Sequence, residues 1–136
     1  MDNCIFCKIL RGEIPSTKLY EDENSMVILD ISPAKKGHAI LLAKEHAANL
    51  FELSDKSAEK ILPVVKKVGQ GIVKTLGCDG LNVLQNNGEA SGQTVFHLHV
   101  HMIPRYKGDD VSIGWKPLSY EEGEMALMAE NIKKNL

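Results

Sequence analysis

The chain has 136 residues, of which 43% are hydrophobic and 25% charged, and this balance predicts a single folded domain over residues 1–136. It excludes a disordered tail protein, a collagen-like repeat and a disulfide scaffold. Because 16 basic residues stand against 18 acidic ones, the net charge is -2, and we expect no nucleic-acid or membrane partner.

The chain carries the features of a cytoplasmic protein. No apolar run approaches the roughly 20 residues of a membrane span, and the first residues lack the basic and apolar regions of a signal peptide. The three cysteines are an odd number with two of them close together. They fit a reducing compartment and a metal or redox pair better than a disulfide framework.

The first part of the chain predicts three strands. Two apolar stretches, residues 19–20 and 26–29, flank a polar cluster at residues 21–25 that suits a hairpin loop. Residues 38–43, which follow Gly37, are a third apolar run of strand length.

A long amphipathic helix is predicted from Ser54 to Leu76, where apolar residues recur at three- and four-residue spacing with lysines opposite them. Pro63 lies inside this pattern and would clash with the carbonyl of Glu59, so we expect a kink or two helices that meet at Pro63. Gly77 is a natural end for this helix.

The second part of the chain predicts two more strands and a terminal helix. Gly80 to Asn86 and Thr94 to Tyr106 have the pattern of strands, and their short connection makes them antiparallel. Ser119 followed by Glu122 is a capping-box signature. One helical face then continues through Met125, Met128, Ala129, Ile132 and Leu136. The order of elements indicates an α+β domain with an antiparallel five-stranded sheet, one long helix and a C-terminal helix.

Histidines alternate with apolar residues over residues 97–103. In a strand alternate side chains share a face, so His97, His99 and His101 point one way while the residues between them point into the core. A lone histidine would more often be a surface or core residue, but three of the five histidines of the chain fall here. The pattern therefore indicates catalysis or metal binding.

Metal ligation and nucleophilic or acid-base chemistry are the rival interpretations of these histidines. His97 and His101 are about 13 Å apart at Cα in a strand, so at most two of the three can share one ion. At least one histidine is free for other chemistry, and neutral imidazole is a natural nucleophile toward phosphorus near pH 7.

The segment before the histidines supplies groups that a phosphate would need. Gly88 and Gly92 allow backbone N–H groups to approach an anion, and Asn86, Gln93 and Thr94 offer side-chain donors beside the histidine face. A glycine-containing segment of this kind is also common as a simple hairpin turn.

The motif at residues 97–103 resembles the signature of the histidine triad (HIT) family, in which three histidines alternate with apolar residues. Further matches lie at residues 4–9, 30–33, 37–38 and 86–95. The resemblance extends from Cys4 to about Tyr106. It is nearest to the bacterial Hit branch beside the Hint-like proteins, and weaker to the Fhit-like branch.

The resemblance implies a homodimeric α+β enzyme that binds a purine nucleotide. Such an enzyme cleaves a nucleoside phosphoramidate, a dinucleoside polyphosphate or a related bond at the α-phosphate. The family's middle histidine, here His99, attacks phosphorus to give a covalent nucleotidyl-histidine, and His101 donates to the phosphate oxygens.

The resemblance also assigns substrate-binding residues. Asn86, Gln93, Thr94 and the N–H of Gly92 would hold the phosphate, Asp30 would accept from the ribose hydroxyls, and His38 would belong to the same site. Two departures stand out: Thr94 replaces the serine of many Hint-like members, and residues 105–108 replace a Gly-Gly-Arg-Gln run. The second departure bears on leaving-group preference.

Cys4-x-x-Cys7 suits redox chemistry, half a zinc site or no function at all. Redox is the poorer fit, because a thioredoxin-like pair follows a strand and only three residues precede Cys4. In zinc-containing relatives the first histidine of the triad and a histidine after the third strand complete a site, which here are His97 and His46. The expected site is a structural zinc whose loss lowers stability before it alters chemistry. The alternative is two buried thiols without metal.

Two function classes therefore stand beside each other. One is a nucleotide hydrolase or transferase that works through His99. The other is a nucleotide-sensing or scaffold protein with vestigial turnover in the same pocket. A metallohydrolase with catalytic zinc on the triad is disfavoured, since strand geometry keeps the histidines apart and no carboxylate is well placed beside them.

Overall fold

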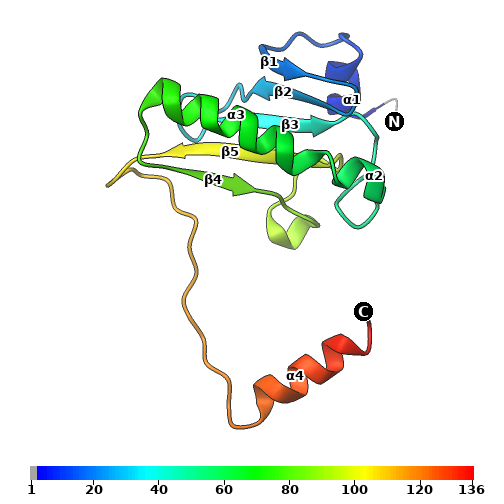
Figure 1. Cartoon of the computed structure of the whole chain (residues 1–136), viewed down its shortest axis with the longest axis vertical. Coiled ribbons are helices and arrows are strands. Elements are labelled where there is room, and N and C mark those ends of the chain that lie inside the picture. Colours follow the sequence, from blue (N-terminus) through cyan, green and yellow to red (C-terminus); the bar gives the residue numbers. More distant parts are fainter. Residues whose placement is uncertain (1–2) are drawn as a thin grey trace.

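A five-stranded antiparallel sheet in the order β1-β2-β3-β5-β4 forms the centre of the computed structural model, which describes residues 3–136 (Figure 1). The strands are β1 (Lys18–Glu21), β2 (Ser25–Leu29), β3 (Ala39–Ala43), β4 (Gly80–Leu84) and β5 (His99–Arg105). The β1–β2 hairpin is closed by the Asp22 carboxylate, which accepts from the N–H groups of Asn24 and Ser25. The predicted α+β class and antiparallel sheet are confirmed.

One face of the sheet is covered by the long helix α3 (Ile61–Leu76), which lies over the strands and runs obliquely along them in Figure 1. The core on this face joins Leu41, Val100 and Met102 of the sheet to Val65 and Ile72 of the helix. As predicted, the apolar residues between the histidines point into this core. The histidines of β5 therefore lie on the other face.

The opposite face carries a second, smaller apolar cluster beneath helix α1 (Ile5–Leu10), an element that the sequence analysis did not predict. Its buried members are Phe6 of α1 and four strand residues, Met26, Ile28, Ile40 and Leu42. Burial on both faces explains why β2 and β3 have no polar side.

The predicted helix over residues 54–76 is two helices, but the break lies before Pro63. The short helix α2 (Asp55–Ala58) is capped by the Ser54 hydroxyl, and α3 begins at Ile61. Pro63 thus occupies the first turn of α3, where its missing N–H would have no partner within the helix. Gly77 ends α3 in the left-handed conformation, with φ 61°, as expected.

The last strand begins later than predicted, at His99 in place of Thr94, and its partner β4 ends at Leu84. The ladder ends at His99: the N–H of Leu98 donates to the carbonyl of Ala47, beyond β3, at 2.8 Å, and only a longer bond of 3.4 Å joins the Leu98 carbonyl to the N–H of Ala43. His97 therefore precedes the strand, and only His99 and His101 are in the ladder with β3.

The C-terminal part of the chain is an extended arm followed by helix α4 (Glu124–Lys133), which stands off the sheet and its helices (Figure 1). A terminal helix is confirmed, but the predicted capping box is wrong: Gly123 caps α4 with φ 77°, and the N–H of Glu121 donates to the Glu124 carboxylate. No helix in residues 3–136 has the length and apolar character needed to cross a membrane.

Candidate active site

Four metal-ligand atoms converge at one end of the histidine face. Cys4 and Cys7 come from α1, His46 follows β3, and His97 precedes β5. Their ligand atoms all lie within 4.8 Å of one another. The Nδ1 atoms of His46 and His97 are 3.1 Å apart, and the Cys7 sulfur lies 3.2 Å from Nδ1 of His46 and 3.5 Å from that of His97.

These separations are close to those around a tetrahedral zinc ion, and the two shortest lie slightly below its range. Zinc bonds of about 2.0–2.1 Å to nitrogen and about 2.3 Å to sulfur place neighbouring ligand atoms roughly 3.3–3.8 Å apart. Nε2 of His97 lies 2.6 Å from the carbonyl of Ala43 and must donate to it, so Nδ1 presents a lone pair to the cluster. Burial raises the pKa of the Cys7 thiol, and a thiolate there needs a cation beside it.

The ring of His99 is held in one tautomer. Its Nδ1 lies 2.7 Å from the carbonyl of His97, and a carbonyl can only accept, so Nδ1 carries the proton and Nε2 carries a lone pair. Burial lowers the pKa of His99, which keeps the ring neutral near pH 7. The sequence analysis did not identify which backbone group would fix this ring.

His101 is held in the opposite tautomer. The N–H of Ala34 donates to Nδ1 of His38 at 3.0 Å, so a neutral His38 carries its proton on Nε2. That atom lies 2.9 Å from Nδ1 of His101, which accepts, and Nε2 of His101 is therefore the N–H donor. Burial and the neighbouring His99 and His38 lower the pKa of His101 to about 4.

Asp30 lies at the end of β2, beside His38. One carboxylate oxygen accepts from the N–H of Ser32 at 2.8 Å, and the other is 3.6 Å from Nε2 of His38. Asp30, His38 and His101 form a second group of potential metal ligands. The 2.9 Å contact between Nε2 of His38 and Nδ1 of His101 is a hydrogen bond with one proton between the two nitrogens, and it needs no ion.

The segment between β4 and β5 differs in part from what the sequence suggested. The Gln93 amide is buried and donates to the carbonyls of Ala48 and Val95, while its oxygen accepts from the N–H of Gly88. The N–H of Gly92 donates to the carbonyl of Glu89, within the short 3₁₀ helix η1 (Glu89–Ser91). In this structure the Gln93 amide and the Gly92 N–H thus bond within the protein, and their role as phosphate ligands stays a prediction.

Two of the predicted phosphate ligands keep their side-chain donors. Within residues 3–136 the side chains of Asn86 and Thr94 have no hydrogen-bond partner, and Thr94 is exposed. A Cβ at Gly92, where φ is 106°, would lie 3.4 Å from the Asn86 amide nitrogen. Glycine at this position therefore allows the close approach of the Asn86 side chain.

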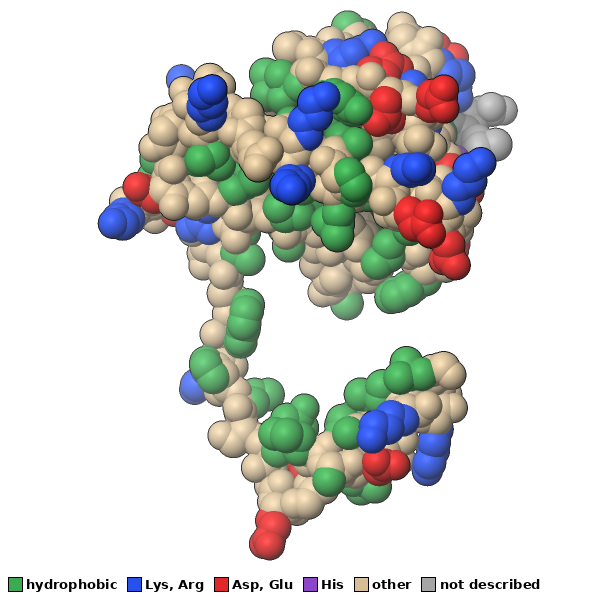
Figure 2. Space-filling view, in the orientation of Figure 1, with side chains coloured by type: hydrophobic (Ala, Val, Ile, Leu, Met, Phe, Trp, Pro, Cys, Tyr) green, Lys and Arg blue, Asp and Glu red, His purple; other side chains and the backbone are tan. Residues whose placement is uncertain are grey.

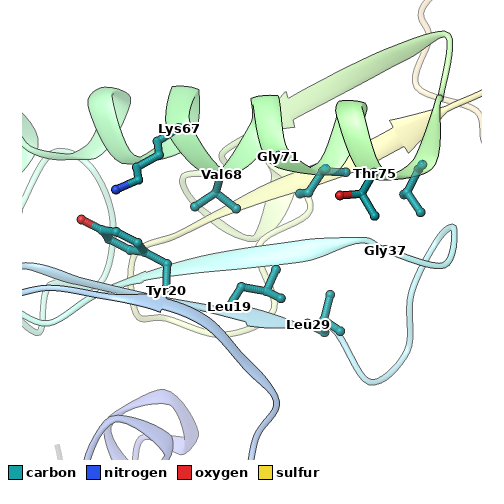
Figure 3. A pocket seen from close by; sticks show the side chains of 10 residues that line it. Leu19, Tyr20, Leu29, Gly37, Lys67, Val68, Gly71 and Thr75 are labelled. Atoms are coloured by element: carbon teal, nitrogen blue, oxygen red, sulfur yellow. The ribbon is translucent and has the colours of Figure 1, made fainter.

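A separate apolar hollow of about 380 Å³ lies on the α3 side of the sheet. Figure 3 shows Leu19, Tyr20 and Leu29 beneath Val68 and Thr75 of the helix. The Lys67 ammonium lies 5.2 Å from the centre of the Tyr20 ring. Among the described residues that line the hollow none is a histidine, cysteine or carboxylate, so the hollow is separate from the histidine site.

Comparison with known proteins agrees with this geometry. Residues 11–108 match the HIT domain family profile. The chain belongs to the HIT family. It is 44% identical over 135 residues to an adenosine 5'-monophosphoramidase of Schizosaccharomyces pombe, covering 98% of each chain.

Two solved HIT structures are informative for this protein. A HIT family member from Bacillus subtilis superimposes with a TM-score of 0.93 at 44% identity, covering 98% of this chain and 97% of that one. A Zn-bound histidine triad protein from Mycobacterium smegmatis has a TM-score of 0.77 at 34% identity, covering 98% and 96% of the two chains.

Several groups of the site escaped the sequence analysis. Helix α1 and the buried Phe6 could have been found, because a cysteine is able to cap a short helix and Phe6 lies between the two cysteines. The backbone groups that hold the rings could not have been predicted, because every residue type carries the same carbonyl and N–H. They are the carbonyls of Ala43 and His97 and the N–H of Ala34.

Proposed function

We propose that this protein hydrolyses purine nucleoside phosphoramidates or dinucleoside polyphosphates at the α-phosphate, with His99 as the nucleophile. The observation that carries the proposal is the hydrogen bond from Nδ1 of His99 to the carbonyl of His97, because it leaves a lone pair on Nε2 of a neutral ring. The identity to a relative named as a phosphoramidase supports this reaction class.

In the proposed reaction the Nε2 lone pair of His99 attacks phosphorus while the bond to the leaving group breaks. The electron pair of that bond departs with the leaving group, which takes up a proton from solvent, and the nucleotide stays attached to Nε2. Water then attacks phosphorus and releases a proton to solvent, the bond to Nε2 breaks, and its electrons return to the ring. His101 donates its Nε2–H to a phosphate oxygen in both steps.

The remaining residues would bind or position the nucleotide. Asn86 and Thr94 have side-chain donors to offer the phosphate, and Asp30 is half-buried with a carboxylate that can accept from ribose hydroxyls. His38 would act on the substrate through His101, whose tautomer it fixes.

Intact-mass spectrometry after brief mixing with adenosine phosphoramidate, and separately with a dinucleoside polyphosphate, tests the proposal. We expect a transient adenylyl adduct that peptide mapping places on His99. Absence of adduct and of turnover with both substrates, together with retained binding of adenosine monophosphate, would contradict a hydrolase and favour a nucleotide-sensing protein.

We also propose one structural zinc ion per chain, held by Cys4, Cys7, His46 and His97. The ligand separations above and the Zn-bound relative from Mycobacterium smegmatis support it. Four protein ligands saturate a tetrahedral ion, so it would tie segments together and take no part in bond breaking. Thiolate ligands require reduced cysteines, which is consistent with a cytoplasmic location.

We propose further that the protein is a symmetric homodimer. Strand β4 is an open sheet edge, and apolar side chains are exposed beside it, with Leu62 of α3 70% and Val83 of β4 49% exposed. The apolar side chains of the arm and α4 stand free of the main body in Figure 2, with Trp115 84% exposed. Pairing equivalent edges around a two-fold axis would cover the edge, and the partner would support the arm.

The relative from Bacillus subtilis supports a bound arm. Its superposition covers 98% of this chain with a TM-score of 0.93, so the segment that contains α4 is included in the match. Within residues 3–136 no residue of α4 is buried. A helix without support would not keep one position, so a second copy of the chain is the natural support.

A further inference from the structure

The aromatic ring of Phe6 lies between the Cys/His cluster and the nucleophile proposed above. Its centre is 4.9 Å from that of the His99 ring at an interplanar angle of 74°, and 6.0 Å from that of His97 at 85°. Both are edge-to-face arrangements, the geometry that aromatic pairs prefer. Phe6 is 8% exposed, so the ring has little freedom.

Helix α1, which carries Phe6, is held by the apolar cluster beneath it and by the Cys/His cluster at its start. A helix of six residues is not stable alone. The Cys4 sulfur caps α1 by accepting from the N–H of Cys7, and the two sulfurs approach Nδ1 of His97 at 3.4 and 3.5 Å. A metal on these atoms would therefore fix the segment in which Phe6 lies.

In residues 3–136 the His99 ring has one hydrogen bond and two aromatic contacts, and two of these three involve residues that belong to or adjoin the Cys/His cluster. The carbonyl of His97 accepts from Nδ1, and Phe6 packs on the ring from α1. The third contact is His101, whose ring centre lies 5.0 Å away at 72°. Orientation of the ring, and not only stability of the fold, is thus tied to the Cys/His cluster.

We infer that Phe6 is a positioning residue for His99, and that zinc on the cluster orients the nucleophile through Phe6 and the His97 carbonyl. The inference rests on the zinc site and the nucleophile proposed above. It departs from the sequence-based expectation that zinc loss lowers stability before it alters chemistry. A reacting group misplaced by about 1 Å can lose about 10²-fold in rate.

The test compares Phe6→Leu, which keeps apolar bulk and removes the ring, with Ile9→Ala. Ile9 lies on the same helix and packs against the same apolar cluster, but its aliphatic side chain has no ring to pack edge-to-face on His99. In zinc-loaded, full-length protein we expect Phe6→Leu to lower kcat by about 10- to 100-fold. Ile9→Ala should stay near the wild-type kcat at equal zinc content.

A second readout needs no substrate. Nitrogen-15 NMR of the imidazole groups should show His99 in the single Nδ1-protonated tautomer in wild type and Ile9→Ala, and in a mixture of tautomers in Phe6→Leu. Wild type stripped of zinc by a chelator should resemble Phe6→Leu. Unchanged His99 signals and kcat in Phe6→Leu would overturn the inference, as would a folded, zinc-free wild type with unchanged His99 signals.

These readouts separate this inference from the proposed function. If wild type turns over neither substrate, the hydrolase proposal fails, while the NMR comparison still decides whether Phe6 orients His99. If wild type turns over substrate but Phe6→Leu equals Ile9→Ala in both readouts, only the positioning role is wrong.

Discussion

The rings of His99 and His101 carry their protons on different nitrogens because backbone and side-chain partners hold them in opposite tautomers. The Nδ1–H of His99 donates a hydrogen bond to the carbonyl of His97, and Nε2 keeps a lone pair. His101 accepts at Nδ1 from His38 and keeps a proton on Nε2. Identical residue types two positions apart thus present a lone pair in one case and an N–H donor in the other, as the proposed nucleophile and donor require.

Substitution of each histidine should give a different loss. His99→Asn removes the nucleophile and leaves Asp30 and the phosphate donors, so turnover should fall by several orders of magnitude while nucleotide binding changes little. His101→Ala removes one donor to the transition state and should reduce the rate by roughly 10²–10³. Steady-state hydrolysis of an adenosine phosphoramidate and calorimetric binding of adenosine monophosphate measure both effects. A His99→Asn variant with substantial activity would contradict the covalent mechanism.

Buried neutral histidines predict how stability depends on pH. Burial lowers the pKa of His38 and, to about 4, that of His101, against an ordinary value of 6.5. Between pH 6.5 and about 4 these histidines are protonated in the unfolded chain but neutral in the native protein. The free energy of unfolding should therefore fall as pH drops through this range. Urea denaturation across this range should show it, with a shallower slope in His101→Asn. Equal slopes would be the contrary result.

Among the elements, helix α3 contains two glycines in different surroundings. A Cβ at Gly69 would lie 2.9 Å from a methyl carbon of Leu81, whereas one at Gly71 meets nothing within 4 Å. Gly71 borders the apolar hollow, and neither glycine has a positive φ. Close packing against β4 therefore explains Gly69 alone.

The two glycines make a matched pair for a stability measurement. Gly71→Ala should raise the free energy of unfolding by about 0.5–1 kcal/mol, because alanine is the better helix former and loses less backbone entropy on folding. Gly69→Ala should gain less, or lose stability, since Leu81 must move. Thermal and urea unfolding of both variants measure the difference. A larger increase in the free energy of unfolding for Gly69→Ala than for Gly71→Ala would contradict close packing of Leu81 against Gly69.

The Cys/His cluster joins three segments that are far apart in sequence: α1, the turn after β3 and the entry to β5. Metal analysis of protein purified without chelator should find one zinc per chain, and Cys4→Ser should lose metal and melt at a lower temperature. Cys78→Ser is the matched control, because Cys78 is a buried free cysteine outside the cluster. Absence of zinc, or full zinc content in Cys4→Ser, would refute the site.

At the scale of the whole molecule, the open β4 edge and the detached α4 are the features on which the proposed homodimer rests. Light scattering or sedimentation at micromolar concentration should give about twice the 15.0 kDa of one chain. Removing residues 110–136 should weaken the dimer, because Trp115 and Leu118 of the arm would no longer have a partner surface. A monomeric full-length protein would contradict the proposal.

The sequence by itself determined the α+β class, the antiparallel pairing of strands and the alternation of histidines with core residues. These follow from local periodicity: Leu98, Val100 and Met102 must face a core, so the histidines between them must face away. The two cysteines and His46 could be proposed as ligands of one ion from residue type and family resemblance alone.

Only the tertiary structure decided where each group acts. It places His97 ahead of β5 and packs Phe6 against His99. It also pairs the Gln93 amide and the Gly92 N–H with backbone carbonyls of the protein. These outcomes depend on backbone carbonyls and N–H groups from distant segments, such as those of Ala43, Ala48 and Ala34. Every residue type carries the same backbone groups, so their partners are fixed by packing and cannot be found in the order of side chains.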